Sequence, residues 1–251
     1  MNERRGSAVL DKFAQTQKTN AEAAKTNQSR KQPKAVYLCI KRAFDFLASL
    51  CVSIILLIPV GILALIIVKK DPGKPFYVQK RVGQNGKVLL LAKLRSMRNG
   101  ADNLEKMLTP EQLDEYRREY KLADDPRLIG YEKPGDSKTC FGAFLRKTSL
   151  DELPQIIWNI CIKGNMSVVG PRPILREELE KNYTEEEQKI LLSVKPGLTG
   201  YWQAYARSNA TYETGERQRM ELYYVHNCSV ALDIKILLAT IVAVVKGRGA
   251  Q

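Results

Sequence analysis

The sequence predicts a mostly helical α+β protein, in which one apolar helix enters a membrane and a larger compact domain follows it. Residues 46–68 form a run of 23 residues without a charged side chain. Residues 71–98 hold two short alternating apolar stretches around a Gly/Asn turn, which is the pattern of a small β-hairpin. Most of the remaining chain has helical periodicity. We therefore expect a tail at 1–34, a membrane helix at 35–70 and a compact domain at 71–251.

Residues 1–34 form the first predicted segment, a disordered basic tail. They are rich in Gln, Asn, Lys, Thr and Ala, and Phe13 is their one aromatic residue. A composition of this kind supplies too little apolar surface for a packed core.

The apolar run leaves two membrane topologies open. As a straight helix, its 23 residues would cover ~34 Å, which is enough to cross a bilayer core of ~30 Å. However, Pro59 removes a helical hydrogen bond near the middle, and basic pairs (Lys41-Arg42 and Lys69-Lys70) flank both ends. A helix that bends at Pro59 and leaves by the face it entered accounts for both features. A tilted, kinked single span is the equal alternative.

The domain that follows begins with the predicted hairpin, whose turn is Gly83-Gln84-Asn85-Gly86. Residues 101–122 are expected to be helical, with Thr109, Pro110 and Gln112 forming a capping box at the start of a second part. Residues 123–138 are rich in turn-forming residues. Further helices are predicted at 140–147, 150–161, 176–194 and 213–225, with a loop at 195–200. Residues 233–245 are strongly apolar yet too short to span, so this helix either packs in the core or lies at the membrane interface.

The distribution of charge argues against a nucleic-acid-binding protein. The formal net charge is +13, and residues 1–98 carry 19 Lys/Arg against 5 Asp/Glu, while residues 99–251 carry 21 against 22. A nucleic-acid binder usually carries its basic stripe on the folded domain. Here the excess surrounds the apolar run, which fits an anionic lipid surface or phosphate-bearing substrates.

The cysteine and histidine content excludes several other kinds of site. The five cysteines are odd in number and have no C-x-x-C spacing, which disfavours a disulfide framework or a zinc site and indicates a reducing compartment. The single histidine, His226, has no neighbouring acid or thiol in the sequence and is more typical of a structural residue than of a catalyst.

Asp151 and Glu152 are the strongest candidates for chemistry. They follow the basic pair Arg146-Lys147 and open an apolar helix. In the structural interpretation, Ser149 and Glu152 form a capping box and Asp151 complements the helix dipole. In the functional interpretation, the helix N-terminus keeps Asp151 ionised as a nucleophile and leaves Glu152 to hold a metal.

A second basic element, Gly170-Pro171-Arg172-Pro173, lies eighteen residues beyond Glu152. Carboxylates beside cations and a rigid turn are the parts needed to handle phosphate and a divalent metal. Motifs recur in a fixed order along the chain: 41–45, 81–83 with 85–87, 93–97, 144–155, 164–173, 195–200, and 222–225 with Asp233.

With these motifs, the chain from about residue 41 to 246 resembles the monotopic phosphoglycosyl transferases, a family of bacterial sugar transferases. The resemblance implies an enzyme on the cytoplasmic face of the bacterial inner membrane, in contact with anionic lipids. It would move a sugar 1-phosphate from a UDP-sugar to polyprenol (undecaprenyl) phosphate and release UMP, as the first membrane step of capsule, exopolysaccharide or glycoconjugate synthesis. No nucleic-acid partner is implied, and a homodimer is left open.

The resemblance also implies roles for individual residues. Asp151 would form a covalent phosphosugar intermediate, Glu152 would help to bind Mg²⁺, and Pro59 would break a re-entrant membrane helix. Phosphate contacts are assigned to Arg146 and Arg172, with Lys93 and Arg95 as further candidates, because a guanidinium group donates paired hydrogen bonds to phosphate. Lipid-headgroup contact is the equal alternative for Lys93 and Arg95.

The chain departs from the family pattern at several positions. Ile58 replaces a common Ser before the central proline, and Asn165 replaces a common Asp, so Asn165 is not assigned to metal. Glu221 stands where Asp is frequent and is a candidate near the nucleotide. Tyr201-Trp202 also differs from the usual sequence and bears on sugar or base choice. The rival interpretation is a membrane-anchored basic binding or scaffold protein, which accounts for the charge and the apolar run but not for the ordered motifs.

Overall fold

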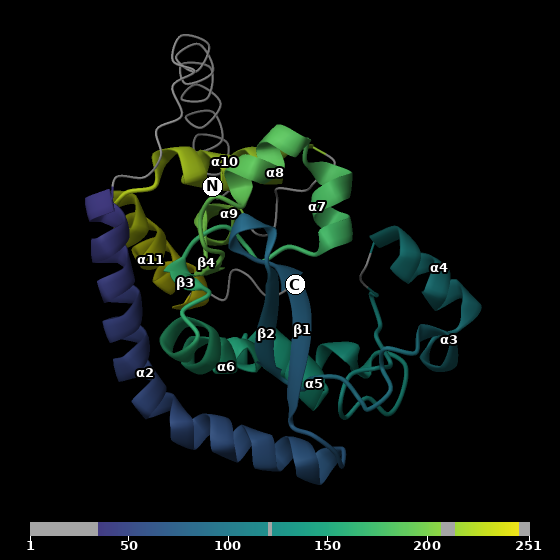
Figure 1. Cartoon of the computed structure of the whole chain (residues 1–251). Helices are drawn as coiled ribbons and strands as arrows, with labels where there is room; N and C mark the ends of the chain where they lie inside the picture. Colours follow the sequence, from purple (N-terminus) through teal and green to yellow (C-terminus); the bar gives the residue numbers. More distant parts are fainter. Residues whose placement is uncertain (1–34, 120–121, 207–213, 246–251) are drawn as a thin grey trace, which may run out of the picture. The chain divides into compact units, whose positions relative to one another are not determined.

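The computed structural model describes residues 35–119, 122–206 and 214–245, and the predicted tail at 1–34 lies outside them. Its fold is α+β and mostly helical, as the sequence predicts (Figure 1). The helices are α2 (Ala35–Lys70), α3 (Leu104–Met107), α4 (Pro110–Glu119), α5 (Phe141–Lys147), α6 (Leu153–Gln155), α7 (Arg176–Asn182), α8 (Glu185–Leu191), α9 (Tyr201–Tyr205), α10 (Glu216–Asn227) and α11 (Val230–Val245). The strands are β1 (Phe76–Val82), β2 (Val88–Leu94), β3 (Ser167–Val169) and β4 (Gly197–Thr199).

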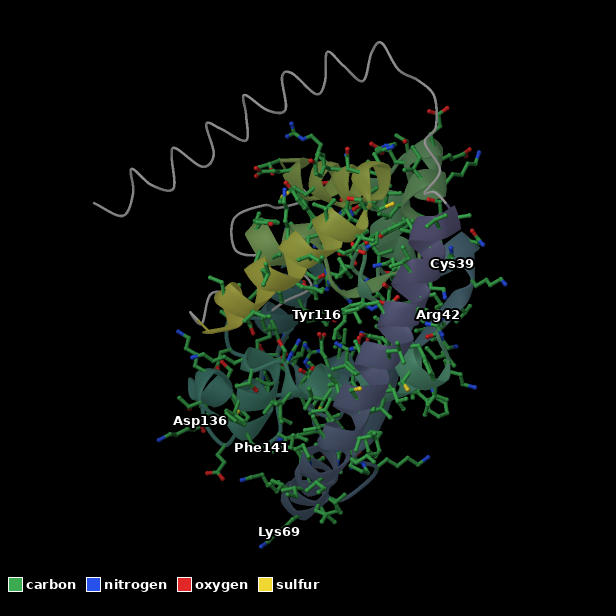
Figure 2. The ribbon with its side chains drawn as sticks, turned by 90° about the vertical axis from the view of Figure 1, so that its left-hand side faces the viewer. Cys39, Arg42, Lys69, Tyr116, Asp136 and Phe141 are labelled. Carbon is green, nitrogen blue, oxygen red and sulfur yellow. The ribbon has the colours of Figure 1, made fainter. Side chains whose placement is uncertain are left out.

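Helix α2 is a single helix of 36 residues that contains Pro59 and bends partway along its length (Figure 1). Among the described residues, it is the one helix long and apolar enough to cross a membrane. Only 17% of its most apolar window is buried, so most of its apolar side chains face outward. Figure 2 shows the helix with Cys39 and Arg42 toward one end and Lys69 at the other.

The buried face of α2 is joined to the rest of the domain by polar contacts near its N-terminus. Tyr37 and Lys41 both donate to Asp233 of α11, at 3.0 and 2.8 Å. Asp45, which is 2% exposed, accepts the Val168 N–H of β3 at 3.0 Å. Because a buried carboxylate is costly without partners, these contacts fix α2 against β3 and α11.

The second half of α2 instead packs through apolar side chains. Val60 and Ile67 are buried with Leu94, Ile129 and Leu145 in one core cluster. A second cluster joins the end of β1 and β3 to helices α7, α8, α10 and α11, and includes Val82, Val169, Leu179, Leu191, Tyr224, Val225 and Ile236. Helix α2 is therefore part of the core of the domain.

The predicted hairpin is confirmed. Strands β1 and β2 pair antiparallel from Phe76↔Leu94 to Val82↔Val88, and the turn between them contains Asn85 in the left-handed region, with φ 57°. The capping box at Thr109 is confirmed as well, since Thr109 N–H donates to Gln112 Oε1 (3.1 Å) and Gln112 N–H donates to Thr109 Oγ1 (3.3 Å).

Two other sequence predictions were wrong. The helix predicted over 176–194 is divided into α7 and α8, because Tyr183 is extended and Thr184 begins a new helix with Glu187 as its capping partner. The loop predicted at 195–200 contains β4, which pairs parallel with β3. Alternating polarity could not reveal strands of three residues, which are too short to carry that pattern.

Candidate active site

The candidate site is built where the segment after α5 meets strand β2. Asn159 is fully buried and joins the two, because its Oδ1 accepts the Ala92 N–H (3.1 Å) and its Nδ2 donates to the Leu90 carbonyl (2.7 Å). An amide side chain thus supplies to β2 the hydrogen bonds that a third strand would otherwise provide. This fixes the position of Lys93, one residue further along β2.

Asp151 and Glu152 lie on a short 3-10 turn (Leu150–Glu152) that leads into α6 and then into a π-helical segment (Ile156–Ile162). The capping box expected from Ser149 and Glu152 does not form. Ser149 has φ 57°, in the left-handed region, and its side chain caps no helix N–H. An N-cap residue needs an extended backbone to aim its side chain at the first turn, so the left-handed conformation of Ser149 rules out this role.

The electrostatic setting of Asp151 also differs from the expectation. Asp151 is 7% exposed, and burial raises its pKa from 3.8 to about 6, whereas a helix N-terminus was expected to favour ionisation. Lys93 and Arg146 act in the opposite direction and hold the pKa below what burial alone would give. The carboxylate is therefore desolvated and remains mostly ionised at neutral pH.

Glu152 is more exposed than Asp151 and has a direct cationic partner. Its Oε1 accepts a hydrogen bond from Lys93 Nζ at 2.9 Å, and the two side chains are 34% and 21% exposed. This ion pair joins the carboxylate turn to the hairpin.

Glu152 and Lys93 open onto a cleft of about 340 Å³, a volume that includes open solvent. Arg172 enters the same cleft from the loop between β3 and α7. The other lining residues are Gln79, Arg81, Leu91, Gln155, Pro173, Gly197, Leu198 and Gln203. The cleft is thus lined by two cations from the hairpin (Arg81 and Lys93), by Arg172 from the loop between β3 and α7, and by three glutamines.

The loop that carries Arg172 is positioned by close backbone packing and by a buried carboxylate. Gly170 and Gly197 approach so closely that a Cβ on either would meet the backbone of the other. Glu221, 3% exposed, accepts the Arg172 N–H at 3.2 and 3.3 Å through its two oxygens. Burial raises the pKa of Glu221 to about 7, while Arg217 and Arg172 act in the opposite direction. Glu221 therefore fixes the position of the Arg172 loop through this backbone hydrogen bond.

The sequence-predicted site residues are brought together only in part. Lys93, Glu152 and Arg172 line one cleft, and Asp151 is the chain neighbour of Glu152. Arg95 and Arg146 are not among the described residues that line it. Arg95 is buried and bonded to Asp71 and to the Lys74 carbonyl, so it fastens the end of β2 to the residues that follow α2. Arg146 is exposed at the end of α5 and acts on Asp151 only through its charge.

Sequence reasoning missed Arg81 as a site residue, although its motif was noted. The hairpin register supplies the missing signal. Gln79 pairs with Leu91 and Tyr77 pairs with Lys93, so Gln79, Arg81 and Lys93 share one face of the hairpin. Alternation was hidden in the sequence because Lys80, between Gln79 and Arg81, is also polar.

The residues present fit a magnesium ion that is shared with a substrate phosphate. Mg²⁺ is usually bound through one or two carboxylates together with phosphates and water. Glu152 lines the cleft, and its carboxylate already forms an ion pair with Lys93. Asp151 is its neighbour in the chain. Within the described parts of the chain, no three His, Cys, Asp or Glu side chains gather to form an all-protein metal cage.

Comparisons of the sequence with known proteins identify relatives of this chain. A sequence model of a family described as bacterial sugar transferase matches residues 36–247. The UDP-galactose-lipid carrier transferase of Erwinia amylovora is 40% identical over 214 residues, which are 84% of this chain and 41% of that protein. The exopolysaccharide production protein ExoY of Rhizobium meliloti is 40% identical over 213 residues, 83% of this chain and 87% of ExoY. The undecaprenyl-phosphate galactose phosphotransferase of Salmonella typhimurium is 38% identical over 214 residues, 84% of this chain and 41% of that protein. This chain therefore spans about two fifths of the Erwinia and Salmonella proteins and most of ExoY.

Proposed function

Because this chain belongs to the bacterial sugar transferase family, we propose that it transfers a sugar 1-phosphate from a UDP-sugar to undecaprenyl phosphate. The products would be an undecaprenyl diphosphate sugar and UMP, in the first membrane step of exopolysaccharide, capsule or glycoconjugate synthesis. The names of the Erwinia and Salmonella relatives support a UDP-sugar donor and this lipid acceptor. Galactose is accordingly the first sugar to test.

One observation carries the proposal. A buried carboxylate, Asp151, is the chain neighbour of Glu152, which lines a cleft together with Lys93 and Arg172, and the charge of Lys93 acts on Asp151. A desolvated carboxylate is a better nucleophile than a hydrated one, and cations around it neutralise the charge of a phosphate that approaches. This combination suits phosphoryl transfer better than it suits binding alone.

In the first step, an Asp151 carboxylate oxygen attacks the phosphorus atom that bears the sugar. The bond from this phosphorus to the bridging oxygen breaks, and the bridging oxygen leaves with UMP. Lys93 and Arg172 would balance the charge on the transferring and leaving phosphates. The result is a sugar phosphate joined to Asp151 as an acyl phosphate.

In the second step, a phosphate oxygen of undecaprenyl phosphate attacks the same phosphorus. The bond to the Asp151 oxygen breaks, which restores the carboxylate and forms the diphosphate of the product. Two displacements at one carboxylate allow donor and acceptor to use the site in turn. Neither step requires a net proton transfer, since both attacking groups are already anionic.

Glu152 would hold Mg²⁺, with donor phosphates completing the coordination. When bound, the ion would stabilise negative charge that develops on the phosphates. Lys93 would then leave the Glu152 carboxylate and turn toward the phosphates. Their ion pair is partly solvated and is therefore weak enough to exchange.

For topology, we propose that α2 is re-entrant and that the catalytic domain lies on the cytoplasmic face. Pro59, the bend of α2, its outward-facing apolar side chains and the basic pairs at both ends support this path. Cysteines introduced at residues 36 and 72 should both resist an impermeant thiol reagent in intact cells. Labelling at one end alone would indicate a true crossing.

The activity is tested with the purified full chain, Mg²⁺, undecaprenyl phosphate and a panel of UDP-sugars that begins with UDP-galactose. Release of UMP is expected. Release of UDP would indicate an ordinary glycosyltransferase, and release of neither nucleotide with any sugar would favour a non-catalytic membrane-anchored protein. Intact-mass analysis after exposure to donor alone should detect one added sugar phosphate, which the Asp151→Asn variant should lack.

A further inference from the structure

We propose that Glu178 is a positioning residue that holds Arg81 and Arg172 toward the cleft, where both guanidinium groups bind the diphosphate of the donor. The identity of this ligand rests on the proposed function. The proposal adds Arg81 to the substrate contacts and gives α7 a role in binding the donor.

Three arginines from separate parts of the chain converge on the Glu178 carboxylate. Its Oε1 lies 3.4 Å from Arg217 Nη2 of α10 and 3.5 Å from Arg172 Nη1 of the loop before α7. Its Oε2 lies 3.7 Å from Arg81 Nη1 of β1. One side chain thus links the hairpin, the Arg172 loop and α10.

Two of these three arginines line the cleft beside Asp151 and Glu152, namely Arg81 and Arg172. Arg217 lies behind them, with its guanidinium carbon 4.1 Å from the centre of the Trp202 ring. Arg172 also lies over this ring, at 5.9 Å. Because Trp202 is 8% exposed, it forms a fixed aromatic surface against which the two guanidinium groups rest.

The contacts of Glu178 are close enough to orient the arginines and long enough for a phosphate to replace the carboxylate as their partner. Distances of 3.4 to 3.7 Å exceed those of tight charge-assisted hydrogen bonds, which are about 2.7–2.9 Å. The carboxylate therefore acts mainly through its charge, and it keeps Arg81 and Arg172 from separating. A diphosphate in the cleft can then accept paired hydrogen bonds from both guanidinium groups.

The local charge favours an anionic ligand. Among the described residues, Arg81, Arg172 and Arg217 face two carboxylates, Glu178 and the buried Glu221. Lys93 and Glu152 add one charge of each sign to the same cleft. With these three carboxylates ionised, the four cations leave the cluster with a net positive charge of about one, which attracts an anionic ligand.

Helix α7 offers a matched pair of variants. Glu178→Gln removes the charge but keeps an oxygen that can accept the Leu175 N–H, which now donates to Glu178 Oε2 at 3.4 Å. Glu180→Gln is the control, because Glu180 is on the same helix, is 59% exposed in its side chain and pairs only loosely with Arg176, at 3.8 Å.

The first measurement is the affinity of the purified full-length variants for UDP, by titration calorimetry. Glu178→Gln should weaken UDP binding about tenfold or more, equivalent to losing one positioned charge contact, and Glu180→Gln should change it by less than about twofold. If wild type binds no UDP, or if Glu178→Gln binds it as tightly as wild type, the proposal is overturned. If Glu178→Gln does not fold, Arg81→Gln replaces it with the same expected loss.

The second measurement separates positioning from general structural support. In steady-state transfer, Glu178→Gln should lower kcat/KM for the UDP-sugar while KM for undecaprenyl phosphate stays within about twofold. In the Arg81→Gln background, Glu178→Gln should affect kcat/KM for the UDP-sugar much less than it does in wild type, because Glu178 acts through that arginine. Full additivity, or an equal loss for both substrates, would contradict the proposal.

These experiments distinguish this inference from the proposed function. UDP binding that depends on Glu178, without UMP release in the presence of undecaprenyl phosphate, would support the diphosphate site and refute the transfer reaction. UMP release with UDP binding that is independent of Glu178 would support the reaction and refute the role of Glu178.

Discussion

Replacing Asp151 with asparagine should abolish transfer and at the same time stabilise the folded protein near neutral pH. An amide cannot serve as the nucleophile, so the covalent route is lost. The stabilisation follows from burial, since Asp151 is 7% exposed and its pKa is raised from 3.8 to about 6. A neutral amide of nearly the same shape avoids the desolvation that the carboxylate suffers.

The magnitude follows from the linkage between ionisation and folding. A rise of the pKa from 3.8 to about 6 corresponds to about 3 kcal/mol of destabilisation by the ionised group. Because the folded-state pKa lies above the unfolded one, the destabilisation is absent below pH ~4, grows between pH ~4 and ~6, and is complete above pH ~6. Asp151→Asn should therefore gain up to about 3 kcal/mol at pH 7.5 and nothing at pH 4.

The assay compares thermal or urea unfolding of wild type and Asp151→Asn between pH 4 and pH 8, in detergent with a chelator present so that no divalent ion offsets the charge. For a domain of this size, about 3 kcal/mol corresponds to roughly 6–12 °C in melting temperature. Activity of wild type should fall as the pH is lowered through about 6, because the nucleophile becomes protonated.

Two results would refute this reasoning. A variant that is no more stable than wild type at pH 7.5 would mean that the buried carboxylate is well solvated or well paired. Appreciable turnover by Asp151→Asn, after exclusion of deamidation by mass analysis, would mean that another group carries the chemistry.

Four further substitutions test the architecture around the site, each by urea unfolding. Asn159→Leu should cost about 2–5 kcal/mol, because two backbone groups of β2 lose buried partners; an unchanged midpoint would show that water replaces the amide. Gly197→Ala should cost more than about 2 kcal/mol, since the new Cβ would collide with the backbone of Gly170, and a tolerated alanine would contradict this close approach. Thr109→Ala should cost about 1 kcal/mol while Ser149→Ala costs less than about 0.5 kcal/mol, and the reverse order would restore the capping role to Ser149.

The parts of the fold that the sequence predicted well are those with local signals. The hairpin has alternating strands and a Gly/Asn turn, and the helix at Thr109 has a complete capping box. The same capping signal was misleading at Ser149, where the left-handed backbone overrides it. A pattern of residue types cannot reveal a backbone conformation that tertiary packing imposes.

The sequence motifs predicted only part of the site. Asp151, Glu152, Lys93 and Arg172 were chosen from the sequence, and the last three line one cleft. The contribution of Glu178 could not be predicted, because its three arginine contacts join residues far apart in the chain. Arg95 was chosen for its charge alone, and its bonds to Asp71 and Lys74 depend on where α2 ends.

The way in which α2 is joined to the domain limits how the protein can be handled. Removing this helix to obtain a water-soluble fragment would remove the Tyr37 and Lys41 contacts of Asp233. It would also expose the apolar side chains against which Val60 and Ile67 pack. Asp233 would keep its hydrogen bond from Tyr224 but lose its cationic partner, and a new apolar face would be exposed. The fragment should therefore aggregate rather than behave as an independent enzyme. Preparation without detergent would require polar substitutions on the exposed face of α2 and an unchanged buried face.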